Sequence, residues 1–463
     1  MAEIKNFVSD KSLQIKALNI YSSTGKKVDL SNIYIAVNIY EDIYSSTMSG
    51  DASFNDSNDL LSDIPIIGFE YIEFELIKPE SPNNILKKVF RIHKVDGPAI
   101  DYGSQKNMTY MIKFFSEEFY LSMGTKVSKS YKQKRIDQIV KDLIDKQLFT
   151  SKLKSSNFQQ SSGLYDIIIP YWTPFRAIEW LTTRAVKAIS KNVTYPFFFY
   201  ENSEGYNFKS IDSMMAAVPL RNYVYEPQNV QLTRYSSEES SPTREIQARK
   251  NNIIQFEFIN YLDMMKAYMH GMFASSLLTF DPIRLQTNQQ IFDYKKQFEN
   301  STHLDNKSGR FNNDILDRTK KSITDRFGVV RKYYPTTLGL DSDPIISNMQ
   351  PNITPNYVES WLLSRISKIE ELNYFKVKLL APGDNVITVG KTITFKMPRI
   401  YAKEKGSSDD HPYFTGKYLV TSVRHMITPF KYEMLIEGIK DDVTKSYPTA
   451  AINNSDLEKI KRS

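Results

Sequence analysis

Acidic residues and histidines supply the candidate sites of this sequence. It contains no cysteine. The densest acidic patch is Asp51, Asp56, Asn58 and Asp59, and its alternating oxygen donors loosely resemble the start of a calcium-binding loop. Leu60 stands at the fifth position of that loop, where Asp or Asn is needed, and no glutamate follows at the twelfth. The patch therefore favours a turn and the start of a helix over a calcium site.

Two further groups have the right residue types for a site. Asp409, Asp410 and His411 are metal-ligand types, but they lie in the polar stretch KEKGSSDDHP, which is more typical of a solvated loop. Glu117 and Glu118 suggest the carboxylate pair of a glycosidase, yet nothing near them in the sequence supplies a second, separately tuned carboxylate. We interpret both groups as surface residues.

The remaining histidines are far apart at positions 93, 270, 303 and 425. His425 lies within the strand-like stretch GKYLVTSVRHMI, and we interpret it as structural. The sequence has no nucleotide-binding loop, no HExxH pair and no GxSxG elbow. The absence of cysteine excludes disulfides, thiolate metal sites and a cysteine nucleophile. We therefore expect no enzyme, no catalytic, cofactor-binding or metal-binding residues, and no cofactor.

Aromatic residues gather in the stretch YPFFFYENSEGYNF, residues 195–208. Such rings either stack on single-stranded nucleic acid or pack around a tight turn. Stacking platforms use alternate, outward-facing rings with basic neighbours. Here Phe197 to Tyr200 are consecutive, so their rings face both sides of a strand, and Glu201 and Glu204 would repel phosphate. We predict a hairpin buried on both faces.

Length and composition set the scale of the fold. The 463 residues predict two to four domains. Tyr and Phe (29 and 27) far outnumber Gly (17), which favours aromatic-rich strands over disorder. The net charge of +7 is a mild surplus of interspersed Lys and Arg, so a nucleic-acid-binding module is disfavoured. Without an apolar leader or a long apolar run, the chain is expected to be soluble and made in the cytoplasm, with no membrane insertion.

The predicted secondary structure changes along the chain from strands to mixed and helical segments and back to strands. Alternating β-branched and aromatic residues predict strands over 13–115. A compact α+β unit follows at 116–213, where Thr173 is a plausible N-cap with Pro174 at the first helical position. Residues 251–371 read as mostly helical, including a helix candidate in YLDMMKAYMHGMFASSLL. Within them, TNQQIFDYKKQFENSTHLDNKSGRFNND (287–314) is polar and is expected to be mobile or partner-bound. The β pattern returns at 372–440, and VPLRNYVYEP (218–227) looks like a strand separated from it.

Several stretches together resemble the baseplate hub family of contractile-tailed bacteriophages, which is related to the N-terminal part of type VI secretion spike proteins. The resemblance begins at VNIYEDIYSSTMSG and IPIIGFE (within 37–76) and continues through IPYWTPFRAIEWLTTRA and PFFFYENSEGYNFKSID (within 169–212). It closes with PGDNVITVGKTITFKMP (382–398) and GKYLVTSVRH (416–425). No single stretch is specific, but together they occur in the family's order. Residues 228–350 match nothing in the family.

The resemblance implies a multidomain α+β fold with two tube-like antiparallel β-barrels, an intervening α+β domain and a mostly helical insertion. The implied domains are the first barrel at 1–115, the α+β domain at 116–213, the second barrel at 214–250 and 372–447, the insertion at 251–371 and a polar tail at 448–463.

The resemblance also implies a structural role in the tail of the virion. Three such chains would present six barrels in a pseudo-hexameric ring that joins the six-fold tail tube to the three-fold central spike. The implied partners are two further copies of the chain, the spike, a tail tube or tube-initiator protein and other baseplate proteins. Tape-measure protein and DNA would pass through the channel without specific binding. The alternatives are a tail-associated cell-wall-degrading enzyme and a spike component of a contractile secretion system.

Overall fold

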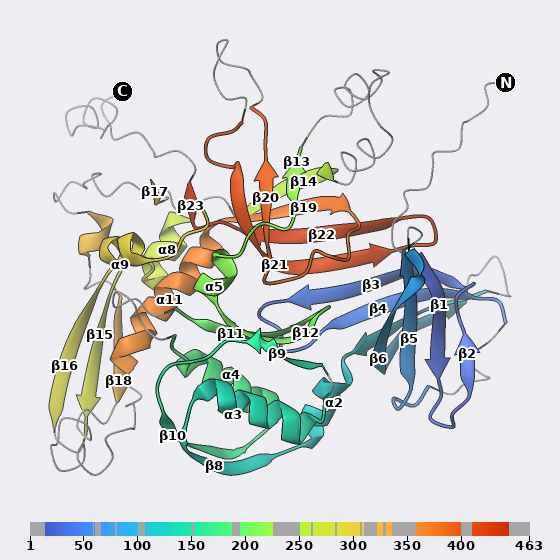
Figure 1. The fold of residues 1–463 in the computed structure, drawn as a ribbon, viewed down its shortest axis with the longest axis horizontal. Coiled ribbons are helices and arrows are strands. Elements are labelled where there is room, and N and C mark those ends of the chain that lie inside the picture. The colour runs from blue at the N-terminus through green and yellow to red at the C-terminus, as the bar shows by residue number, and fades with distance from the viewer. Residues whose placement is uncertain are drawn as a thin grey trace.

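The computed structural model describes most of the chain (Figure 1). The described residues are 14–58, 60, 66–78, 81–100, 107–150, 152–187, 195–225, 251–260, 263–282, 285–305, 308–309, 322–326, 330–335, 358–399 and 410–443.

The N-terminal part forms the predicted strands. Along β3, side chains alternate between more and less buried positions, as expected for a strand with one face on a core. Neighbouring strands pair antiparallel in the order β3-β4-β7-β6-β5-β1-β2. The seven strands are β1 (Gln14–Tyr21), β2 (Lys27–Asp29), β3 (Tyr34–Asp42), β4 (Ser49–Asp56), β5 (Tyr71–Lys78), β6 (Ser81–Ile100) and β7 (Met108–Phe115).

An α+β unit follows, and its longest helix starts where the sequence predicted. Thr173 is the extended residue before the helix and Pro174 is its first residue, although the Thr173 side chain makes no capping hydrogen bond. The helix ends at Arg184. The elements are α2 (Glu117–Gly124), β8 (Val127–Lys134), α3 (Ile136–Leu143) with a π-helical turn (Ile144–Leu148), β9 (Leu153–Phe158), β10 (Tyr165–Trp172), α4 (Pro174–Arg184), β11 (Phe197–Asn202), β12 (Gly205–Ser210) and α5 (Ile211–Met215).

The aromatic hairpin β11–β12 is packing, as predicted. All four residues from Phe197 to Tyr200 are buried, with at most 7% of each exposed. Phe198 and Tyr200 belong to the core shared with the β regions, whereas Phe197 and Phe199 belong to the core of the α+β unit. The Phe199 ring stacks on Tyr206 of the returning strand at 5.5 Å. The hairpin therefore joins two cores, and its rings are not available to stack on bases.

The C-terminal strands continue the sheet of the N-terminal part. One edge of β21 pairs with β22 along its length, and the other edge pairs first with β20 and then with β3. A single 13-stranded sheet therefore contains both β regions, with one core across them (Figure 1). The C-terminal strands are β13 (Asn222–Val224), β14 (Gln255–Asn260), β19 (Lys376–Pro382), β20 (Thr392–Lys396), β21 (Gly416–Ile427) and β22 (Tyr432–Ile439), followed by β23 (Asp442–Val443).

The insertion is less helical than predicted. The helix candidate beginning at residue 261 is helical only over Met264–His270, because Gly271 takes a left-handed conformation (φ +82°) that ends it. The described residues of the stretch predicted to be mobile or partner-bound contribute to β16, α9 and β17, and β14 pairs with β19 in the main sheet. The elements are α8 (Met264–His270), β15 (Ala274–Asp281), β16 (Gln286–Asp293), α9 (Tyr294–Asn300), β17 (Ser308–Gly309), a 3₁₀ turn (Ile323–Asp325), β18 (Arg331–Pro335) and α11 (Val358–Tyr374).

The chain is thus a multidomain α+β protein, which confirms the predicted fold class at that level. In Figure 1 the three-stranded sheet of β15, β16 and β18 lies at one end of the molecule, and β1, β2 and β5 lie at the other. No helix in the described part of the chain is long and apolar enough to cross a membrane. The predicted C-terminal tail, 448–463, is outside the described residues.

Candidate functional site

The acidic patch forms a turn and part of a strand. Asp56, at the end of β4, accepts hydrogen bonds from the backbone N–H groups of Asn58 (2.8 Å) and Leu60 (2.7 Å), which is the geometry of a turn. Asp51 lies earlier in the same strand and accepts hydrogen bonds from two side chains of β3. Asp59 is outside the described residues. The side chains of Asp51 and Asp56 therefore serve the sheet and its turn.

The residues of the polar loop contribute packing. His411 stacks on Phe414 with ring centroids 4.0 Å apart, and burial lowers the pKa of its imidazole. Asp410 makes an isolated backbone bridge with Pro398. Asp409 is outside the described residues.

The two neighbouring glutamates of α2 have different surroundings. The Glu117 side chain is 44% exposed and accepts a hydrogen bond from Tyr71. Glu118 is buried, and its carboxylate lies 2.8 Å from the ammonium of Lys152. Lys152 also contacts Glu201 of β11 at 2.8 Å. Glu118 thus ties α2 to the aromatic hairpin.

His425 is buried on β21, next to the carboxylate of Glu41, which no sequence motif identified. Its Nδ1 lies 2.9 Å from the Tyr432 hydroxyl, and its Nε2 lies 3.9 Å from the Glu41 carboxylate. Burial, and then the charge of Lys88, lower the pKa of His425 to about 4. Burial raises the pKa of Glu41 to about 7, although Thr388 and two backbone N–H groups donate hydrogen bonds to it.

A cavity of about 40 Å³ adjoins this pair. Its lining comes from both β regions and from the turn of the aromatic hairpin, where the ammonium of Lys88 donates to the carbonyl of Ser203 at 3.0 Å. That volume is sufficient for water. The cavity therefore marks the place where three parts of the chain meet around one buried carboxylate.

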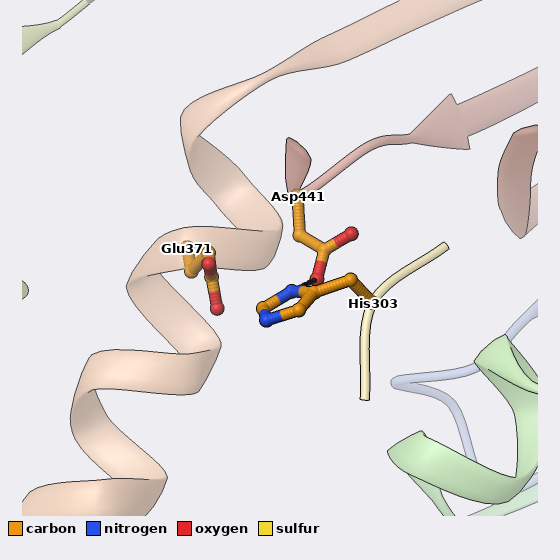
Figure 2. A group of neighbouring side chains, drawn as sticks. All are labelled: His303, Glu371 and Asp441. Atoms are coloured by element: carbon orange, nitrogen blue, oxygen red, sulfur yellow. Dashed lines mark hydrogen bonds and ion pairs between the residues drawn. The ribbon is translucent and has the colours of Figure 1, made fainter. Parts of the chain in front are cut away.

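A group of ionisable side chains lies around His303, which follows α9 (Figure 2). Its Nδ1 lies 2.8 Å from Asp441 Oδ2, just after β22. Lys368 of α11 lies between two carboxylates, with its Nζ 2.8 Å from Glu371 Oε2 and 3.2 Å from Asp441 Oδ2. Tyr294 donates a hydrogen bond to the other oxygen of Glu371 at 2.7 Å. The group joins the insertion to the end of the main sheet.

The charges in this group support one another. Burial alone would lower the pKa of His303, but the hydrogen bond and charge of Asp441 outweigh it, and the pKa lies above its usual value. Burial likewise opposes the charge on Lys368, but Glu371 and Asp441 together raise its pKa. Burial opposes ionisation of Asp441, yet Lys368 and His303 hold its pKa well below its usual range. Two cations thus face two carboxylates.

His303, Glu371 and Asp441 are close enough to hold a metal ion, but their hydrogen bonds do not fit one. His303 Nε2 donates to the carbonyl of Phe298 at 2.6 Å, and Nδ1 faces a carboxylate, so both ring nitrogens carry protons. A metal ligand must instead offer a nitrogen lone pair. The ammonium of Lys368 already lies between the carboxylates. The residues form a buried ionic cluster.

Sequence reasoning missed this cluster because its members are far apart along the chain. His303 and Asp441 are separated by 138 residues, and Lys368 and Asp441 by 73. The one local signal is the spacing of Lys368 and Glu371, which places them on the same helical face. That signal is common on solvated helices.

Comparison with known proteins supports the fold. No known family and no curated protein matches the sequence. Among solved structures, the chain is similar to a tail protein from Neisseria meningitidis MC58, with 10% identity and a TM-score of 0.50 over 95% of this chain and 100% of that one. It is equally similar to the 43 kDa tail protein of prophage MuSo2 from Shewanella oneidensis, with 8% identity and a TM-score of 0.50 over 92% and 98% of the two chains. The chain therefore has the fold of phage tail proteins, and the resemblance seen in the sequence is confirmed at that level.

Proposed function

We propose that this chain is a structural baseplate subunit of a contractile phage tail. Three copies form an adaptor between the six-fold tail tube and the three-fold central spike, around a channel for tape-measure protein and DNA. The observation that carries the proposal is the likeness to two tail proteins over more than nine-tenths of the chain. The family resemblance of the sequence supplies the trimer, the partners and the location in the virion.

The hydrogen bonding supports a second tube-like barrel in the C-terminal β region. Strands follow one another in the order β13-β20-β21-β22-β19-β14. An isolated parallel bridge between Val224 and Asn252 then connects β13 to the residues before β14. Next to it, Ile253 N–H donates to the Val224 carbonyl at 2.9 Å, and Ile254 N–H donates to the Leu380 carbonyl at 2.8 Å. These bonds therefore connect the last strand of this order, β14, through the residues before it, to the first strand, β13.

Chain geometry supports a first barrel in the N-terminal part. In the sheet, β2 and β3 are six strand spacings apart, which in a flat sheet is about 29 Å. The connection from Asp29 to Tyr34 spans at most about 19 Å, at 3.8 Å between successive Cα atoms. The sheet must therefore curl until its two ends approach each other. Two curled regions per chain give three chains six similar positions around an axis.

A passive channel must release DNA as fast as it enters. Each phosphate held by Lys or Arg adds salt-dependent affinity that must be broken as the duplex moves. We therefore expect the +7 surplus to lie on outer surfaces, in segments such as KSYKQKR (129–135) and EKIKRS (458–463). A channel wall lined by unpaired basic side chains would instead indicate an active grip on DNA.

The test of the assembly is the mass of the purified chain in solution. Light scattering should give three times the 53.7 kDa of one chain. Electron microscopy of that particle should show a ring of six similar densities. A monomer at micromolar concentration, or a ring of a different order, would reject the adaptor.

We also propose that the chain performs no enzymatic turnover on the cell wall. Glu117 and Glu118, the candidate carboxylates, are engaged with Tyr71 and Lys152. A turbidity assay on purified cell walls should therefore show no clearing. Clearing that survives in the Glu118→Gln variant would point to an enzyme with another site.

A further inference from the structure

Lys368, Glu371 and Asp441 are three buried residues whose amine and carboxylate groups lie next to one another. Their exposed fractions are 2%, 4% and 1%. The amine nitrogen of Lys368 lies 3.2 Å from Asp441 Oδ2 and 2.8 Å from Glu371 Oε2. An amine, a carboxyl group and a second carboxylate that can move protons are the reactants and the base needed to form an amide.

The surroundings also supply the stabilising groups for that reaction. The backbone N–H of Leu304 donates to Asp441 Oδ1 at 3.2 Å, where negative charge would develop when the carbonyl carbon is attacked. His303 Nδ1 lies 2.8 Å from Oδ2, the oxygen that would leave. The Tyr294 hydroxyl holds Glu371 in place at 2.7 Å. Each group faces the atom on which it would act.

We propose that Lys368 and Asp441 join spontaneously through an intramolecular isopeptide bond, with Glu371 as the base. Glu371 takes one proton from the Lys368 ammonium, and the free amine attacks the Asp441 carbonyl carbon. The Nζ–Cγ bond forms and the Cγ–Oδ2 bond breaks. Oδ2 leaves as water with one proton from His303 and the second proton released by the nitrogen. The products are a neutral amide, a neutral Glu371, a neutral His303 and one water molecule.

Burial favours both the rate and the product. Reactants that the fold holds side by side react as if at a very high concentration, because their freedom of movement has already been lost on folding. Four charged groups are replaced by neutral ones, and removing buried charges is favourable in a low-dielectric interior. The reaction needs no oxidant, no reductant and no cofactor. It is independent of the proposed tail function.

The bond would fasten the insertion to the main sheet. Lys368 lies on α11, and Asp441 lies between β22 and β23, 73 residues further along the chain. The cross-link would close the chain between them into a loop. A loop of this kind restricts the unfolded chain and slows the separation of the two elements.

The test is the mass of the full-length protein, measured under denaturing conditions. The wild-type protein should be lighter than its sequence by the mass of one water molecule. Trypsin should then release a branched peptide in which ISKIEELNYFK (366–376) is joined to DDVTK (441–445), and fragmentation should locate the branch at Lys368 and Asp441. Lys368→Arg, which keeps the cation, and Glu371→Gln, which lacks the base, should both have the full sequence mass.

Lys440→Arg is the matched control, because Lys440 is equally buried and lies 2.7 Å from Asp305. It should keep the mass deficit. A wild-type protein that retains its full mass after prolonged incubation overturns the proposal. A deficit that maps to a cyclic imide at one aspartate, without a branched peptide, overturns it as well. So does a deficit that persists in Glu371→Gln, since the base would then have no role.

Discussion

The sites around His303 and His425 can be compared directly, because each residue is 8% exposed. His303 faces Asp441 at 2.8 Å, and its pKa is raised. His425 faces Glu41 at 3.9 Å, and its pKa is lowered to about 4. The same ring at the same exposed fraction thus has a raised pKa in one site and a lowered pKa in the other.

The difference lies in what keeps the neighbouring carboxylate ionised. Asp441 is held charged by the ammonium of Lys368 at 3.2 Å. Burial raises the pKa of Glu41 to about 7, and the ammonium of Lys88, whose charge acts against this rise, donates a hydrogen bond to a backbone carbonyl instead. The direction of each histidine's pKa shift thus follows from whether a second cation holds the neighbouring carboxylate ionised.

Removing that second cation, Lys368, should have the largest effect on the free energy of unfolding. Lys368→Met should lower the free energy of unfolding by about 3–5 kcal/mol relative to Lys368→Arg, because two carboxylates are left buried without their partner. The Arg variant keeps the charge and cannot form the isopeptide bond, so the difference isolates the cation. Denaturant unfolding of both variants measures it. Equal stability would mean that water already neutralises the cluster.

The two histidines should change the free energy of unfolding differently as the pH falls. The folded pKa of His425 lies below its unfolded value of 6.5, so its contribution to stability is present above pH 6.5 and is lost as the pH falls through about 4. The loss amounts to about 3 kcal/mol. His425→Gln should therefore lose less stability between pH 7 and pH 4 than the wild type. An unchanged acid limb in His425→Gln would contradict the assignment.

His303 should show the opposite pH dependence. Its folded pKa is raised, so its contribution is fully present below pH 6.5 and is lost as the pH rises through the folded pKa. In the Lys368→Arg background, His303→Gln should cost about 1.5–3 kcal/mol at pH 6, the range for a hydrogen bond to a charged group. The cost should shrink at alkaline pH. Unfolding curves at pH 6 and pH 9 measure both, and a cost that grows with pH would show a neutral ring.

The smallest effect concerns the hydroxyl beside His425. Tyr432→Phe removes the 2.9 Å hydrogen bond to Nδ1 and should cost about 0.5–1.5 kcal/mol. It should leave the pH dependence of the His303 site unchanged, because the two sites share no residue. NMR titration of both imidazoles in this variant is the measurement. A shift at His303 would show that the sites are coupled.

The sequence predicted the parts of the molecule that depend on local pattern. Alternation identified the N-terminal strands, Pro174 located the start of α4, and the consecutive rings from Phe197 to Tyr200 identified a hairpin buried on both faces. The helix assigned across Gly271 was wrong, because an apolar run alone does not show where a left-handed residue ends a helix.

The candidate site was beyond such patterns. The partners of His303 come from α11 and from the end of β22, and only the fold brings them together. The opposite pKa shifts of the two histidines depend on a third residue in each site. No spacing in the sequence records that dependence.

The pairing of β21 with β3 has a consequence for the newly made chain. Arg424 bonds to Asn38 across a separation of 386 residues. At 5–20 residues per second, roughly 20–80 s of translation separate the two strands. During that time one edge of β3 has no strand to pair with, and open edges recruit other chains. Slow or crowded synthesis should therefore yield aggregates nucleated at the first half of the protein, and a chaperone that covers this edge should suppress them.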